Sequence, residues 1–252
     1  MHTDATVGEA ATQQRDEQTR IDESHTRSSR DGTDILSEHE ARGVVIVIAS
    51  TRVGSFERYR ALAAIFALIF VTLVVIVATG RPALDLADAQ WIAAHRREAL
   101  IPIAEALSLT GSVAGIIPLG VLAAVLLWRR DGWPSVGWLV VANAGASILY
   151  LVINLAMAST RPPMPLRVVD SIGWSFPSGH STQAAVFWPM LAVLSGWRHA
   201  LAPAIGMVCL IGASRLCLDV HWTTDVASGY ALGLAWLFTV LAVRARRVSV
   251  RA

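Results

Sequence analysis

Six apolar runs, separated by shorter polar segments, fill most of the sequence after residue 60. They cover residues 61–79, 113–128, 136–156, 182–197, 201–218 and 226–243. A helix of about 20 residues crosses the hydrocarbon core of a bilayer, and a chain inside the bilayer must satisfy its own backbone hydrogen bonds. The runs therefore predict an all-α bundle of six transmembrane helices in an integral cell-membrane protein.

Charged residues are concentrated in the first part of the chain. Of the 40 charged side chains (21 basic plus 19 acidic), 19 lie in residues 1–60. Residues 1–40 contain no aromatic residue, so they offer too little apolar surface to offset the entropy lost on ordering. The composition predicts a disordered cytoplasmic tail over residues 1–57, a six-span membrane domain over residues 58–247 and a cytoplasmic tail over residues 248–252.

Basic residues beside the apolar runs indicate the orientation of the bundle, because arginine and lysine accumulate in cytoplasmic loops. They precede the first run, join the second to the third and the fourth to the fifth, and follow the sixth. With six spans, all these positions lie on one side, which predicts that both termini are cytoplasmic. Residues 80–112, 159–181 and 219–225 then lie on the outer face. Within them, residues 85–107 fit either an amphipathic helix on the membrane surface or a solvated helix.

Membrane lipids are the expected partners of such a bundle. The formal net charge of +2, without a dense basic cluster, excludes a nucleic-acid partner. The oligomeric state stays open, since small residues such as Gly229 and Gly233 can pack within one chain or between chains.

Ionisable residues gather near the ends of the later runs, where such groups are costly and usually functional. His221 and Asp225 are four residues apart, which places two side chains on one helix face or across a tight helix start. A carboxylate there can hold the imidazole, fix which ring nitrogen is free and stabilise the cation formed on attack. A lone histidine at the end of a span is more often structural, so the prediction of a nucleophile at His221 depends on its neighbours.

The residues expected near His221 are of types that bind anions. Ser178 and Gly179 precede the fourth run, so their backbone N–H groups are expected at a helix N-terminus, where the dipole favours negative charge. His180 follows directly and distinguishes the segment from an ordinary helix cap. Arg161 and Arg215 can each offer paired N–H donors to phosphate oxygens. These residues predict a phosphate site at one membrane face.

At this point the pattern resembles the type 2 phosphatidic acid phosphatase superfamily, also called the lipid phosphate phosphatases. The motifs of that superfamily are Lys-x6-Arg-Pro, Pro-Ser-Gly-His and Ser-Arg-x5-His-x3-Asp. The second motif is complete at residues 177–180 and the third at Ser214, Arg215, His221 and Asp225. The resemblance covers roughly residues 61–243.

The resemblance implies an enzyme that hydrolyses a lipid phosphate or diphosphate, of phosphatidic acid or undecaprenyl diphosphate type, at the outer membrane face. In such an enzyme, His221 attacks phosphorus to form a phosphohistidine and Asp225 orients it. His180 protonates the leaving lipid oxygen and later activates water. The residues expected to hold the phosphate are Arg161, Ser178, Gly179 and Arg215. No metal and no cofactor is implied.

The first motif departs from the family pattern. Arg161-Pro162 is present, but Asn154 stands where the family has lysine. An amide can still donate a neutral hydrogen bond, which is weaker than a charged one. Asn154 is therefore a candidate phosphate contact, and Arg167 in the same outer segment is a second. Two alternatives stay open: a phosphotransferase of the same fold, and a non-catalytic lipid-binding relative.

Overall fold

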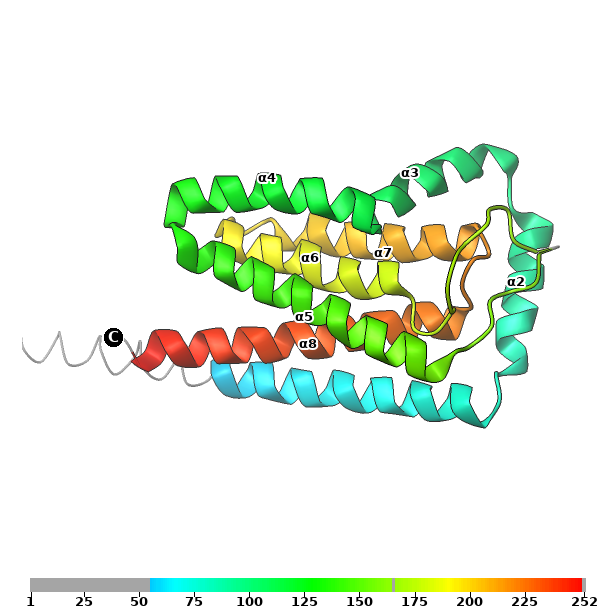
Figure 1. The fold of residues 1–252 in the computed structure, drawn as a ribbon, viewed down its shortest axis with the longest axis horizontal. Coiled ribbons are helices and arrows are strands. Elements are labelled where there is room, and N and C mark those ends of the chain that lie inside the picture. The colour runs from blue at the N-terminus through cyan, green and yellow to red at the C-terminus, as the bar shows by residue number, and fades with distance from the viewer. Residues whose placement is uncertain (1–54, 165, 251–252) are drawn as a thin grey trace, which may run out of the picture. The chain divides into compact units, whose positions relative to one another are not determined.

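The computed structural model describes residues 55–164 and 166–250. The predicted tail falls almost entirely on residues 1–54, outside this part. All regular elements in the described ranges are helices, which confirms the all-α prediction for them (Figure 1). After a first helix, Ser55–Thr79, they are α2 (Ala83–His95), the short 3₁₀ helix η1 (Glu98–Leu100), α3 (Ile101–Gly111), α4 (Val113–Asp131), α5 (Trp133–Met157), α6 (Gly179–Ser195), α7 (Leu201–Cys217) and α8 (Thr223–Val250).

Each apolar run forms a helix, but the helices differ in length. The first helix, α4, α5 and the Thr223–Arg247 part of α8 are long and apolar enough to cross a membrane. Helices α6 and α7 have 17 residues each. That number corresponds to roughly 25 Å at about 1.5 Å per residue, less than the roughly 30 Å of hydrocarbon. The structure thus supports four spans by length and composition, and the count of six stays a prediction.

The outside of the bundle is apolar. Leu68 of the first helix is 68% exposed and Val113 of α4 is 73% exposed. Many other large apolar side chains are also exposed on the outside of the bundle. Water-soluble monomers rarely expose so much contiguous apolar surface, whereas a bilayer requires it. The exposed surface and the four long apolar helices identify an integral membrane protein.

Helix α6 is the most buried helix of the bundle and packs against α5, α7 and α8. Two glycines of α8 permit a close approach to it. A Cβ atom on Gly229 would lie 2.5 Å from the carbonyl oxygen of Ser178, and one on Gly233 would lie 2.6 Å from that of Thr182. These glycines therefore pack within the chain, and their contact holds the start of α6 beside the first half of α8.

Residues 85–107 form two α-helices joined by the 3₁₀ helix η1, rather than the single helix predicted. Helix α2 ends at His95, and α3 begins at Ile101 with Pro102 in its first turn. Proline lacks an N–H and its ring clashes with a preceding helical turn, so it starts helices and interrupts them. Helix α3 packs against α7 and buries Ser108, which makes it part of the bundle rather than a helix lying only on the membrane surface.

Candidate active site

The residues singled out from the sequence lie at one end of the bundle. Helices α5 and α7 end there, α6 and α8 begin there, and α2 crosses this end (Figure 1). The connection between α5 and α6, residues 158–178, and the connection between α7 and α8, residues 218–222, lie at the same end. Segments that are far apart in the sequence are thereby brought to one face.

His221 lies in the connection before α8 and is buried. Its Nδ1 is 2.9 Å from the carbonyl oxygen of Ser175 and 3.7 Å from Oδ2 of Asp225. Because both of these oxygens accept hydrogen bonds, the proton belongs on Nδ1 and the lone pair on Nε2. Burial lowers the pKa of His221 to about 4, against the opposing effect of Asp225. The imidazole is therefore uncharged at neutral pH, and its lone pair lies on Nε2, the atom that can act as a nucleophile.

Asp225 is fully buried in the first turn of α8 and is held from two sides. Its Oδ2 accepts hydrogen bonds from the hydroxyl of Ser175 and from the backbone N–H of Trp222. Its Oδ1 accepts from both Nη1 and Nη2 of Arg81, each at 3.1 Å. Ser175 also accepts from Nδ1 of His221 through its carbonyl oxygen. The carboxylate is therefore connected to His221 chiefly through Ser175.

The two predicted phosphate-binding arginines use their donors differently. Nη1 of Arg161 lies 3.2 Å from Nε2 of His221 and donates to the carbonyl oxygen of Val220 at 2.6 Å. Its Nε and Nη2 donate to backbone carbonyl oxygens of the 158–178 connection, so a phosphate at Arg161 has to replace one of these partners. Arg215 is 5% exposed and donates to the hydroxyl of Ser108. Its buried Nε has no hydrogen-bond partner among the described residues. An unpaired buried donor costs free energy, so a phosphate oxygen beside Arg215 would remove an existing penalty.

The second motif forms the start of α6. The hydroxyl of Ser178 caps this helix by accepting from the backbone N–H of Ser181. The N–H of Ser178 itself donates to the carbonyl oxygen of Asp225 at 2.9 Å. A phosphate contact of this N–H would have to replace that bond, and the phosphate-binding role of Ser178 stays a prediction. The N–H groups of Gly179 and His180, in the first turn, are the ones left for an anion.

The side chain of His180 belongs to the same site as His221. It interacts electrostatically with Arg215, His221 and Arg161, so the two histidines lie at one end of the bundle. His180 also lines a cavity of 290 Å³. Other residues that line this cavity are Val113, Tyr150, Leu151 and Gln183.

Asn154 lies in the last turn of α5 and is buried. Its Nδ2 donates to the carbonyl oxygens of Trp174 and Phe176, at 3.1 Å and 3.0 Å. Both amide hydrogens are thus engaged by the 158–178 connection, and the phosphate contact suggested for this amide stays a prediction. Arg167 interacts electrostatically with Arg161, and its buried Nε is unpaired within the described ranges.

Sequence reasoning missed Arg81 and Asp85, which reach the site from the segment before α3. Besides its bonds to Asp225, Arg81 donates to Oδ2 of Asp85 at 3.0 Å. Asp85 accepts from the backbone N–H and the hydroxyl of Thr224, at 3.0 Å and 2.6 Å. The only signal in the sequence is the four-residue spacing of Arg81 and Asp85, which is typical of an ion pair on a helix.

Two further contacts come from the same segment. Arg96 forms an ion pair with Asp219 at 2.6 Å, and Ser108 accepts from Arg215. We call Arg81, Asp85, Arg96 and Ser108 together the α2–α3 clamp, since each of them binds a residue between positions 215 and 225.

The arrangement provides a nucleophile, a second histidine and two guanidinium groups at one end of the bundle. These are groups that phosphoryl transfer can use, because it depends on positioning and on stabilising charge on the phosphate oxygens. In the part of the chain that the structure describes, no three His, Cys, Asp or Glu side chains are grouped as metal ligands.

Comparisons with known proteins give a consistent result. The PAP2 superfamily model matches residues 135–249. Phosphatidylglycerophosphatase B of Bacillus subtilis (strain 168) is 32% identical over 140 residues, which cover 52% of this chain and 68% of that protein. Decaprenylphosphoryl-5-phosphoribose phosphatase of Mycobacterium tuberculosis (strain ATCC 25618 / H37Rv) is 33% identical over 125 residues, covering 47% of this chain and 66% of that protein.

Solved structures share the fold. The crystal structure of a transmembrane PAP2 type phosphatidylglycerolphosphate phosphatase from Bacillus subtilis superposes with a TM-score of 0.68 at 23% identity, covering 73% of this chain and 96% of that one. The crystal structure of Aquifex aeolicus LpxE superposes with a TM-score of 0.53 at 24% identity, covering 64% of this chain and 96% of that one.

Proposed function

The chain belongs to the PAP2 superfamily, and from this premise we propose that it hydrolyses a lipid phosphate or diphosphate through a phosphohistidine on His221. The strongest support is the position of Nε2 of His221, unprotonated and 3.2 Å from Nη1 of Arg161. A nucleophile beside a guanidinium group is the pairing that attack on a phosphate requires.

In the first step, the lone pair on Nε2 of His221 attacks phosphorus. An N–P bond forms while the P–O bond to the lipid breaks, and His180 gives its proton to the departing lipid oxygen. Arg161, Arg215 and the N–H group of Gly179 stabilise the charge that builds on the phosphate oxygens. This step requires a neutral His221 and a protonated His180 at the same time.

In the second step, water replaces the lipid. His180, now neutral, takes a proton from the water molecule as the water oxygen attacks phosphorus. The N–P bond breaks, inorganic phosphate leaves, and His180 is again protonated. In this proposal Arg167, whose Nε is buried and unpaired among the described residues, adds a contact to the phosphate from the 158–178 connection.

Arg81 acts in this scheme as a positioning residue. It touches neither histidine, but it binds both Asp225 and Asp85. An unpaired carboxylate is expensive to bury, so Arg81 allows Asp225 to stay ionised at the start of α8. Ser175 then transmits the orientation of Asp225 to His221.

The proposed substrate is a lipid that carries a terminal phosphate. The names of the relatives specify a phosphatidyl lipid in one case and a decaprenyl lipid in the other. The cavity beside His180, apolar at Val113 and Leu151, suits the first carbon atoms of the leaving group. The flanking arginines favour an active site on the outer face and cytoplasmic termini.

The test is to trap the intermediate. Purified full-length protein receives radiolabelled phosphatidylglycerophosphate, phosphatidic acid or undecaprenyl diphosphate and is quenched in alkali, which preserves phosphohistidine. We expect label on the natural protein and on His199→Asn, an exposed histidine at the other end of α6, and none on His221→Asn. Equal labelling of the two variants, or no label with any substrate, contradicts the proposal.

Measuring inorganic phosphate with and without an acceptor separates hydrolysis from transfer. Release of phosphate that does not depend on a second lipid or a sugar supports a hydrolase. Release that requires such an acceptor, together with labelled acceptor, identifies a phosphotransferase.

A further inference from the structure

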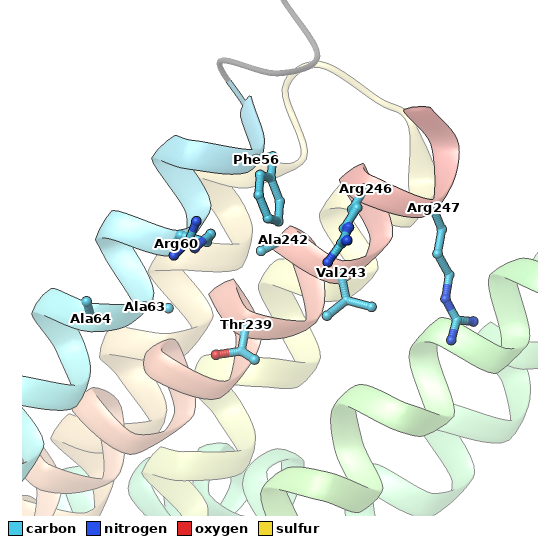
Figure 2. Close-up of a pocket in the computed structure, with 9 residues that line it drawn as sticks. All are labelled: Phe56, Arg60, Ala63, Ala64, Thr239, Ala242, Val243, Arg246 and Arg247. Carbon is cyan, nitrogen blue, oxygen red and sulfur yellow. The ribbon is translucent and has the colours of Figure 1, made fainter. Parts of the chain in front are cut away.

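A cavity of 810 Å³ lies between the first helix and the last turns of α8, at the end of the bundle opposite the candidate active site (Figures 1 and 2). From the first helix it is lined by Phe56, Arg60, Ala63 and Ala64, and from α8 by Thr239, Ala242, Val243, Arg246 and Arg247. A cavity of this size accommodates a headgroup together with part of a chain.

The lining changes from charged to apolar along both helices. On the first helix, Arg60 is followed one turn later by Ala63 and Ala64, and on α8 Arg246 is preceded one turn earlier by Ala242 and Val243. The charged ends are level with each other at the edge of the bundle. The apolar parts continue toward its middle, where the hydrocarbon of a bilayer lies.

The arginines at this edge are available to an anion. Figure 2 shows Arg60 and Arg246 on the two helices that border the cavity. Arg60 contacts Glu57 at 3.4 Å, but both side chains are largely exposed, and such pairs hold weakly. Arg246 forms no hydrogen bond or ion pair within the described part of the chain, and Arg247 stacks on the ring of Trp138.

We propose that this groove binds an anionic phospholipid of the surrounding bilayer, with its phosphate between Arg60 and Arg246 and the upper part of an acyl chain against the alanines and Val243. A free phosphate ion would need the two guanidinium groups only. A lipid also accounts for the half of the groove that is lined by the alanines and Val243. A lipid changes from a charged headgroup to an apolar chain, and the lining of the groove changes in polarity in the same direction. The groove is separate from the catalytic residues, which lie at the other end of α8.

The test measures lipid retention by native mass spectrometry. Full-length protein is extracted from vesicles that contain equal amounts of phosphatidylglycerol and phosphatidylcholine. We expect phosphatidylglycerol to be retained, and retention to fall about fivefold for each of Arg60→Gln and Arg246→Gln. Arg129→Gln, an exposed arginine on α4 at the same end of the bundle, is the matched control and keeps normal retention.

A second variant tests the acyl-chain half of the site. Ala64→Trp fills the groove without altering its charge, and it should reduce retention while phosphatase activity stays normal. His221→Asn should retain the lipid normally, so loss of the proposed chemistry and loss of this site are distinguishable. Equal retention of both lipids, or an equal effect of Arg129→Gln and Arg246→Gln, overturns the proposal.

Discussion

Two parts of the described chain meet at the candidate site and contribute different things. Residues 135–249, which match the family model, contain both histidines, Asp225 and the arginines expected to hold phosphate. The α2–α3 clamp lies before that match and supports these groups from behind. Chemistry demands particular side chains at fixed spacing, so it recurs as motifs, whereas a supporting contact needs only a donor or acceptor within reach. The clamp is thus part of the site without being part of its signature.

The largest predicted effect is on kcat, and it compares a histidine of the family-matched part with a histidine of the segment that contains the clamp. His180→Asn removes the proposed proton donor and should lower kcat by about 10²- to 10⁴-fold. His95→Asn changes an exposed histidine of α2 that stacks on Trp91, and it should leave kcat unchanged. Initial rates of phosphate release measure both. A substrate whose leaving group needs no protonation should restore much of the lost rate in His180→Asn, and failure to do so would argue against a role as proton donor.

The second effect concerns the clamp itself. Arg81→Gln leaves Asp225 without its cationic partner, and the resulting misplacement of His221 should lower kcat by about a hundredfold. KM should stay near its normal value, because Arg81 does not touch the phosphate in the proposed scheme. Arg97→Gln, in the exposed turn after α2, is the matched control. A rise in KM with normal kcat would show instead that Arg81 binds substrate.

The difference between the two parts also explains what the sequence can predict. The spacing of residues 177–180 and of His221 and Asp225 identified groups that the fold places at one end of the bundle. No spacing identified Ser108, because its single hydrogen bond joins it to Arg215, 107 positions away. The two bonds of Asn154 could not be predicted for a related reason, since its acceptors are backbone carbonyls, which every residue provides. The apolar runs also did not predict that α6 and α7 have only 17 residues each. A helix ends where the next connection begins, and apolarity alone does not determine that position.

A third effect tests whether the two parts together bury the nucleophile. Burial lowers the pKa of His221 from 6.5 to about 4, so its neutral, nucleophilic form persists as the pH falls and is lost only below about 4. At pH 5 the neutral fraction should exceed that of an ordinary histidine by about thirtyfold. NMR titration of protein labelled in its histidine rings measures this, with His221→Asn assigning the signal. A midpoint near 6.5 would mean that water reaches the imidazole.

A fourth, smaller effect concerns the contact that brings α6 against α8. Gly229→Ala places a Cβ atom 2.5 Å from the carbonyl oxygen of Ser178, so the helices must separate. The free energy of unfolding should fall by about 1–3 kcal/mol. Gly206→Ala is the matched control, because a Cβ atom there meets nothing within 4 Å. Thermal unfolding in detergent compares them, and equal stability of the two variants would show that the close approach is not required.

The smallest effect tests a residue that lies in the family-matched part but behaves like the clamp. Asn154→Ala removes the two hydrogen bonds that hold the 158–178 connection, which should lower the free energy of unfolding by about 1–2 kcal/mol and leave KM unchanged. Asn143→Ala, on the same helix, removes an amide whose Oδ1 is buried and unpaired within the described residues, so it should cost less. If instead KM rises in Asn154→Ala while stability is kept, the amide contacts phosphate. Position 154 would then belong with the chemistry of the motifs after all, because a supporting residue changes how well the loop is held and not how tightly the substrate binds.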